Sequence, residues 1–101
     1  MNHTVECCIP LSHPSIAGHF PGNPIVPAVV ILNEVIAACN EWQPDLSISG
    51  LSSAKFVSPL RPEEVFSIYL DTTAKNSMKF ECRIEDKILV SGKLQITNSE
   101  S

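Results

Sequence analysis

The chain has 101 residues, of which 44% are hydrophobic and only 18% are charged, and its net charge is -4. This length fits a single domain over residues 1–101, with a tail at residues 98–101 that we expect to be frayed. Seven lysines and arginines in an acidic chain argue against a nucleic-acid-binding surface. The apolar composition favours further burial between subunits, so we expect a homodimer or a higher oligomer.

Residues 4–11 form the first predicted strand, which ends at Pro10 and the turn residues after it. Residues 15–26 are predicted to be a loop, because the glycines and prolines in this stretch forbid regular structure over much of its length.

A helix is predicted from Ala28 to about Trp42. Pro27 suits its first turn, because proline has a preset φ and no N–H to lose there. Pro44 ends the helix and pushes Gln43 towards extended geometry.

This helix is apolar around most of its circumference. A polar or small stripe covers about 120°, and the remaining ~240° is apolar. The stripe consists of Asn33, Glu34, Ala37, Asn40 and Glu41. Such a helix has to be wrapped by other elements, and a curved antiparallel sheet would do so.

The second half of the chain supplies such a sheet. Four strands are predicted at residues 47–58, 65–74, 78–84 and 88–97, with turns at residues 59–64, 76–77 and 85–87. In the second of these strands, apolar Phe66, Ile68 and Leu70 alternate with their neighbours. A run of strands with one segregated helix predicts an α+β fold with an antiparallel sheet.

Four cysteines, at positions 7, 8, 39 and 82, form neither a C-x-x-C metal pattern nor an obvious disulfide framework. We expect all four to be reduced, small core residues of a cytoplasmic protein. No secretory signal is predicted at the start of the chain. The longest apolar run is too short, and too polar in its middle, to span a bilayer.

The stretch GHFPGNPIVPAVVILNE resembles the signature of the hot-dog-fold β-hydroxyacyl-(acyl carrier protein) dehydratases, in which a G-H-F-P-G-x-P-x-x-P-G loop enters a long central helix. Eight residues match in register: Gly18, His19, Phe20, Pro21, Gly22, Pro24, Ile25 and Pro27. Two weaker likenesses follow, because AKFVSPLRPEE resembles K-F-x-x-P-x-x-P-G-D and ILVSGKLQI resembles the closing strand of the family. The predicted order of elements is also that of the hot-dog fold, a long central helix wrapped by a curved antiparallel sheet.

The resemblance implies a hydro-lyase that removes water reversibly from a (3R)-hydroxyacyl thioester in fatty-acid or related acyl-chain biosynthesis. The acyl chain would be carried on the phosphopantetheine of acyl carrier protein or coenzyme A, and no metal or redox cofactor is expected. The family joins two sheets edge to edge and places two active sites at the subunit interface. In each site, the loop histidine comes from one chain and a helix carboxylate from the other.

His19 is the candidate base that takes a proton from C2 of the acyl chain, because neutral imidazole titrates near working pH. A loop histidine bonded only to backbone is the alternative. The unpaired N–H of Ala28, with Gly22 in support, is the candidate donor to the thioester oxygen. The family has glycine where this chain has Ala28, and the added methyl narrows the tunnel. Phe20 is expected in the core or tunnel wall, and Pro27 fixes how the loop approaches the helix.

The family's helix carboxylate falls at Asn33, and an amide cannot supply a proton to the leaving hydroxyl. Glu34 follows, but it is rotated by about 100° around the helix. Three outcomes stay open: a slow dehydratase in which Asn33 positions a water, a dehydratase in which Glu34 is the acid, or an acyl-thioester-binding subunit without turnover. For both residues, a solvated or interface stripe is the alternative. A thioesterase of the same fold is also open, although it too usually places a carboxylate near the helix.

Four other polar residues have simpler expected roles. His3 and His13 are expected at the surface, because two isolated histidines do not make a metal site. Lys55 and Arg61 could meet an acidic carrier protein, and isolated surface cations explain them as well.

Overall fold

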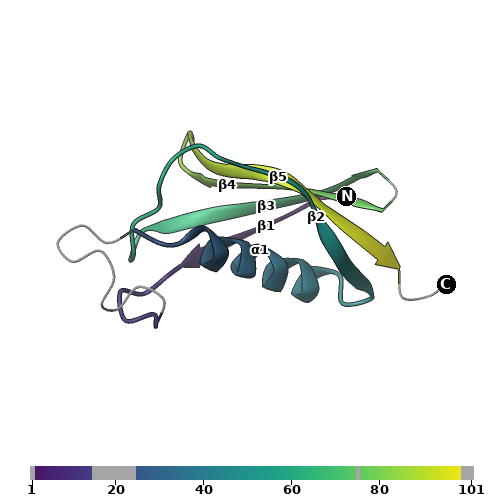
Figure 1. Cartoon of the computed structure of the whole chain (residues 1–101), viewed down its shortest axis with the longest axis horizontal. Coiled ribbons are helices and arrows are strands. Elements are labelled where there is room, and N and C mark those ends of the chain that lie inside the picture. Colours follow the sequence, from purple (N-terminus) through teal and green to yellow (C-terminus); the bar gives the residue numbers. More distant parts are fainter. Residues whose placement is uncertain (1, 15–24, 75, 99–101) are drawn as a thin grey trace.

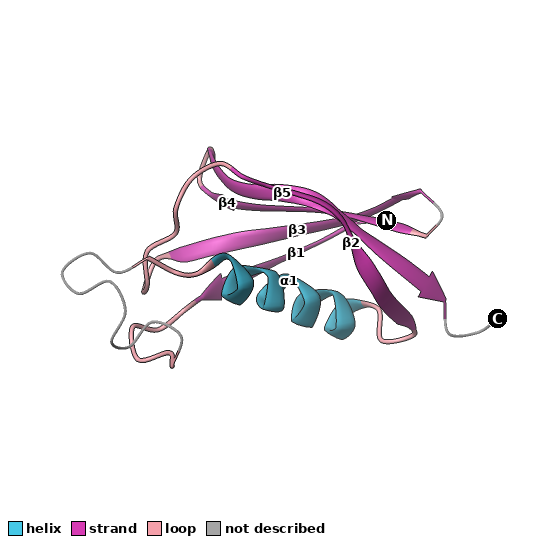
Figure 2. Cartoon of the chain, in the orientation of Figure 1, coloured by secondary structure: helices cyan, strands magenta, loops and turns pink. Residues whose placement is uncertain are grey.

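The computed structural model of the protein describes residues 2–14, 25–74 and 76–98. In these residues one helix, α1 (Ala28–Trp42), lies against one face of a five-stranded sheet (Figure 1, Figure 2). The strands are β1 (Asn2–Cys8), β2 (Leu46–Phe56), β3 (Val65–Ala74), β4 (Ser77–Ile84) and β5 (Lys87–Asn98). The predicted order of elements and the α+β class are confirmed.

The sheet has the strand order β1-β3-β4-β5-β2, and every neighbouring pair is antiparallel. The strands β3, β4 and β5 follow one another directly, whereas β1 and β2 form the two edges. The register of β2 against β5 shifts between Ile48 and Gly50 and again between Leu51 and Ser53. Such irregularities bend a strand, and β2 curves towards the end of α1 (Figure 1).

Prolines mark both ends of α1. Pro27 has φ -61 and ψ 147, so it is the N-cap residue and stands just before the first turn rather than within it. At the other end, the N–H of Gln43 donates to the carbonyl of Cys39 at 2.8 Å, and Gln43 itself has left the helical conformation. The predicted bounds of the helix are confirmed.

The hydrophobic core lies between α1 and the sheet. The helix buries five side chains, Val30, Ile31, Val35, Ala38 and Cys39. The central strands bury alternate residues against them, among them Phe66, Ile68, Leu70, Met78, Phe80 and Cys82. The alternation predicted for β3 is therefore confirmed, and it defines an inner face towards α1 and an outer face away from it.

One side of α1 is left uncovered. Asn33, Ala37, Asn40 and Glu41 are exposed, as the polar stripe predicts. The expectation that the apolar residues are all wrapped is wrong for Val29, which is 60% exposed. Val29 stands about one turn before Asn33 and shares its side of the helix, and this single sheet covers only the opposite side.

The first strand differs from its predicted bounds of 4–11, because it begins at Asn2 and ends at Cys8. The buried Ile9 turns its carbonyl to the N–H of Glu63, at 2.8 Å, instead of to a neighbouring strand. Pro10 has no N–H for a ladder and accepts a turn hydrogen bond from His13 at 3.0 Å.

The second strand ends at Phe56, two residues earlier than predicted. The N–H groups of Val57 and Ser58 both donate to the carbonyl of Leu89, at 2.8 and 3.3 Å. One acceptor shared by two consecutive donors cannot continue a regular ladder, so the chain turns away from the sheet here.

The last two strands begin one residue earlier than predicted, at Ser77 and Lys87. In the turns before these strands, Asn76 and Glu85 adopt left-handed backbone conformations, with φ of 64 and 53. A positive φ allows a tight turn between neighbouring antiparallel strands. β5 extends to Asn98, which pairs with Leu46. The predicted frayed tail is therefore wrong for this residue, and residues 99–101 lie outside the described part of the chain.

The cysteines divide into two groups. Cys39 and Cys82 are buried in the core, Cys7 is half-buried, and all are free thiols. The expectation of a core position is wrong for Cys8, which is exposed, because it follows Cys7 in β1 and points to the outer face. Among the described residues, no helix is long and apolar enough to span a membrane.

Candidate active site at the start of the helix

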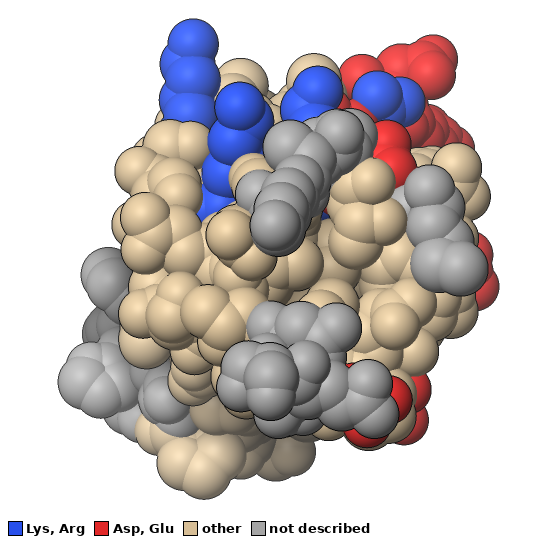
Figure 3. Space-filling view, turned by 90° about the vertical axis from the view of Figure 1, so that its right-hand side faces the viewer, with Lys and Arg blue, Asp and Glu red and all other residues tan. Residues whose placement is uncertain are grey.

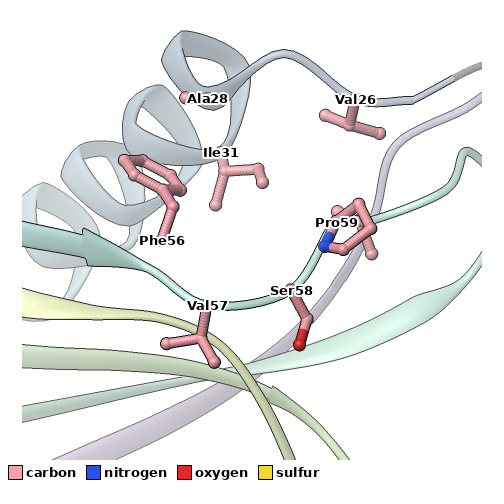
Figure 4. A pocket seen from close by; sticks show the side chains of 8 residues that line it. Val26, Ala28, Ile31, Phe56, Val57, Ser58 and Pro59 are labelled. Carbon is pink, nitrogen blue, oxygen red and sulfur yellow. The ribbon is translucent and has the colours of Figure 1, made fainter.

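A pocket of about 320 Å³ opens where α1 begins (Figure 4). Its walls come from the segment entering the helix and from the chain that leaves β2. They consist of Val26, Ala28, Ile31, Phe56, Val57, Ser58, Pro59 and Leu60. The N–H of the buried Val26 donates to the carbonyl of Leu60 at 2.8 Å, which ties the two walls together. The lining is mostly apolar, and it suits an acyl chain or the methylene part of a thioester arm.

Besides the side chain of Ser58, the polar groups beside this pocket are backbone amides at the start of α1. The amides of Val30 and Ile31 donate to the carbonyl of Pro27, at 3.0 and 3.4 Å. The preceding amides, of Ala28 and Val29, have no acceptor within the helix. Since α1 carries no acidic residue in its first turn, no side chain of the helix itself neutralises the partial positive charge of its first turn. Ala28, the predicted oxyanion donor, thus lines an apolar pocket at a site that favours negative charge.

Asn33 does not line the pocket. It is exposed on the uncovered side of α1, about 7.5 Å along the axis from Ala28 at 1.5 Å per residue. The described part of this chain therefore brings no reacting group to the amide of Asn33.

Glu34 is directed elsewhere, because it points to the edge strand β1. The Cys7 thiol donates a hydrogen bond to Glu34 Oε1 at 3.0 Å, and both residues are half-buried. Burial, and then the hydrogen bond to Glu34, raise the pKa of Cys7 to about 12. The thiol therefore stays protonated at neutral pH and keeps donating to the carboxylate. Glu34 and Asn33 thus face different surroundings, as their angular separation on the helix predicts.

Three predicted site residues, His19, Phe20 and Gly22, lie outside the described residues. The fold nevertheless brings together two stretches that carry the family resemblance, because the start of α1 and the segment after β2 line one pocket. Residues 57–60 were not predicted as site residues. The first of the two weaker likenesses, AKFVSPLRPEE, was the signal that could have identified them. Cys7 carried no such signal, because its contact with Glu34 depends on the packing of β1 against α1.

The remaining polar candidates lie away from this pocket. The ring of His3 stacks on Trp42, with 5.2 Å between centroids and 11° between planes, so it is packed rather than freely exposed. Arg61 is exposed, and its backbone N–H donates to Glu64 Oε1 at 3.0 Å. Within the described ranges, no three histidine, cysteine, aspartate or glutamate side chains cluster in a way that could hold a metal ion.

Comparison with known proteins identifies the family. Residues 1–93 match the sequence model of the ApeI-like family, described as ApeI dehydratase. The 3-hydroxyacyl-(acyl carrier protein) dehydratase FabZ of Ehrlichia canis is 29% identical over 87% of the chain, and that of Lactobacillus helveticus is 30% identical over 76%. The chain spans 68% and 60% of the lengths of these two relatives.

Solved structures confirm the hot-dog fold. The dehydratase heterocomplex ApeI:P from Xenorhabdus doucetiae superposes with a TM-score of 0.83 at 21% identity, covering 96% of this chain and 88% of that one. An uncharacterised protein from Erwinia carotovora gives 0.80 at 20% identity, with 99% and 86% covered. The fluoroacetyl-CoA thioesterase FlK gives 0.69 at 11% identity, with 99% and 87% covered. At these identities the likeness shows the fold, which dehydratases and thioesterases share.

Proposed function

The chain belongs to the ApeI-like dehydratase family, and on that basis we propose that it removes water from a 3-hydroxyacyl thioester carried on acyl carrier protein or coenzyme A. The observation that carries the proposal is the apolar pocket at the start of α1, with Ala28 in its wall. A thioester bound there would have its carbonyl oxygen near the free amides of the helix start, which stabilise developing negative charge.

The reaction needs a proton removed from C2 and a hydroxyl lost from C3. We assign the first step to His19, so that the C2–H electrons form the C2=C3 bond as the C3–O bond breaks. The hydroxyl has to leave as water, and Asn33 cannot supply the proton. That proton therefore comes from the imidazolium just formed, either directly or relayed through a water held by Asn33, so that His19 ends neutral and one water leaves. The whole reaction needs no redox partner, and we propose no cofactor beyond the phosphopantetheine of the substrate.

We further propose that the working unit is a dimer in the cytoplasm. Large apolar side chains are exposed at the helix start and along the β2 edge, with exposed fractions of 60% for Val29, 47% for Leu51 and 55% for Val57. β2 is an edge strand, whose unpaired backbone groups can be covered by another strand. A second chain on this side would bring its own loop to the Asn33 stripe and complete two sites.

The test is to incubate the protein with a 3-hydroxyacyl-carrier thioester and to measure the enoyl product. Product formation above that of a His19→Ala variant supports the proposal, whereas equal rates for the two proteins refute it. Coenzyme A and carrier-protein thioesters of several chain lengths, tested in parallel, identify the substrate class.

A second candidate function is an acyl-thioester-binding subunit that does not turn its ligand over. Asn33 favours it, because the carboxylate next to it in the sequence, that of Glu34, already accepts a hydrogen bond from Cys7. One solved structure of similar fold is a dehydratase heterocomplex, and a mixed dimer would let an active partner supply the missing acid. Tight binding of the acyl carrier with no product, and turnover only after mixing with an active homologue, would support this role.

A thioesterase is the remaining alternative within the fold. Release of free carrier thiol or coenzyme A from an acyl thioester, without enoyl product, would favour it over both other functions. The same reaction mixture, assayed with a thiol reagent, separates the two chemistries.

A further inference from the structure

A second hollow lies on the outer face of the sheet, away from α1. Its volume is about 270 Å³, and it crosses three adjacent strands, β2, β5 and β4. It is lined by Ser53, Ala54, Lys55, Lys79, Ser91, Gly92 and Lys93. We call it the lysine groove. In Figure 3, lysine and arginine side chains gather along the upper edge of the molecule, which is the side of the sheet opposite α1 (Figure 1).

The strand register places the three lysines together. Lys79 of β4 stands directly opposite Lys93 of β5, and Lys93 stands opposite Ser53 of β2. Lys55 pairs with Ser91, two positions along the same ladder. All three lysines are exposed, and the alternation that buries the inner face sends them to the outer one.

Lysines that line one hollow repel one another. Like charges directly opposite each other on a sheet destabilise it, and three of the seven basic residues of an acidic chain meet here. Acidic side chains on the same face lie beside the groove and not in its lining. Asp71 is opposite Lys79 in the register and lines a neighbouring hollow together with Lys79 and Glu81, which is itself ion-paired with Arg83. Lys55 and Lys93 line the groove with no acidic side chain in its lining, so the groove presents a net positive charge that an anion would balance.

The groove and the helix-start pocket lie at the same end of β2, on opposite faces of the sheet. Lys55 lines the groove, and the next residue, Phe56, lines the pocket. Consecutive strand residues face opposite sides of a sheet, so the two sites lie on opposite faces of the sheet beside the point where the chain leaves β2. A ligand with an anionic group and a flexible thiol arm could reach round this end and occupy both.

We propose that the lysine groove binds the phosphate ester of the thiol carrier that brings the acyl chain to the pocket. This inference rests on the proposed function. Three ammonium groups and the hydroxyls of Ser53 and Ser91 are suitable donors to phosphate oxygens. Two carriers share this chemistry, phosphopantetheine on a carrier protein and the nucleotide part of coenzyme A.

The test measures binding, so it does not depend on turnover. Phosphopantetheine, adenosine 3′,5′-bisphosphate and phosphate-free pantetheine are titrated into the protein at low salt and followed by NMR chemical shifts. The variants are the triple Lys55→Gln, Lys79→Gln, Lys93→Gln change and a control, Lys87→Gln. Lys87 is exposed and lies outside the groove.

We expect the phosphate-bearing probes to bind and to shift resonances of the groove, and pantetheine to leave those resonances unchanged. Each lost lysine should weaken binding roughly two- to fivefold, as for exposed ion pairs, and the triple variant tenfold or more. Binding should weaken as salt is added, and Lys87→Gln should match the native protein. The tighter of the two phosphate probes identifies the carrier.

Two results overturn the proposal: no phosphate-bearing probe binds, or the triple variant binds as well as the native protein. A folded triple variant is expected, because all three lysines are exposed, and its melting temperature checks this. Turnover of a short phosphate-free 3-hydroxyacyl thioester by the native protein tests the proposed function separately. If that turnover is absent while the groove binds phosphate, the catalytic proposal fails and the groove stands.

Discussion

The Cys7 thiol donates a hydrogen bond to the carboxylate of Glu34 at 3.0 Å, from edge strand β1 to helix α1. This contact occupies the carboxylate that stands next to Asn33 in the sequence. It also joins β1 to the helix on the inner side of the sheet, so it should stabilise the fold. Because Glu34 already accepts this hydrogen bond, the contact also argues against Glu34 as the catalytic acid.

Removing the thiol should destabilise the fold. Cys7→Ala deletes the donor and part of a packed side chain, so we expect a loss of about 1–2 kcal/mol in the free energy of unfolding. The measurement is urea denaturation at pH 7. Cys8→Ala is the matched control, because Cys8 is adjacent but exposed, and its change should stay within about 0.5 kcal/mol. Equal effects of the two substitutions would contradict a structural role for the hydrogen bond.

The protein should lose stability at alkaline pH. Burial and Glu34 raise the pKa of Cys7 from 9.0 to about 12, and burial with nearby negative charge raises that of Cys82 to about 12. The folded state therefore keeps thiol protons that the unfolded state releases above pH 9. Their contribution is complete below pH 9 and falls as the pH rises towards 12.

The free energy of unfolding between pH 8 and pH 10.5 measures this effect. Cys7→Ala should make the decline shallower, because one of the shifted thiols is gone. An unchanged slope in the variant would show that the Cys7 thiol titrates alike in the folded and unfolded states.

Restoring a carboxylic acid on the uncovered side of α1 should raise activity. If the site has its base and oxyanion donors, Asn33→Asp supplies the missing acid, and we expect turnover to rise by tenfold or more, towards the ~10²–10⁴-fold that general acid–base catalysis typically contributes. The rate of enoyl product formation is the readout. Asn40→Asp, on the same exposed stripe, is the control for added charge.

The role of Glu34 is tested by the same assay. Glu34→Gln keeps an acceptor for the Cys7 thiol, so we expect turnover to stay within a factor of about two. A large loss of turnover with a normal melting temperature would instead identify Glu34 as the acid and reverse the assignment.

Local chemistry explains which parts of the fold were predictable. The bounds of α1 follow from Pro27 and Pro44, and those of β3 from its strict alternation. The pocket wall after Phe56 and the contact between Cys7 and Glu34 join residues 27 or more positions apart. No local pattern encodes such contacts, since they depend on where strands of distant sequence position pack. The exposure of Val29 has a similar cause, because hydrophobic periodicity does not tell whether a face is covered by the same chain or by another.

The β2 edge should carry the subunit contact. Leu51→Lys replaces an exposed apolar residue of this edge strand with a charged one. Burying that charge in an interface costs free energy, so the dissociation constant of the dimer should rise at least tenfold. Sedimentation over a range of protein concentrations measures the change. Val65→Lys is the matched control, since Val65 is 56% exposed in β3, a strand with neighbours on both sides. If the two variants dissociate alike, or neither does, the contact lies elsewhere, and a second chain would not bring its loop to Asn33 along this edge.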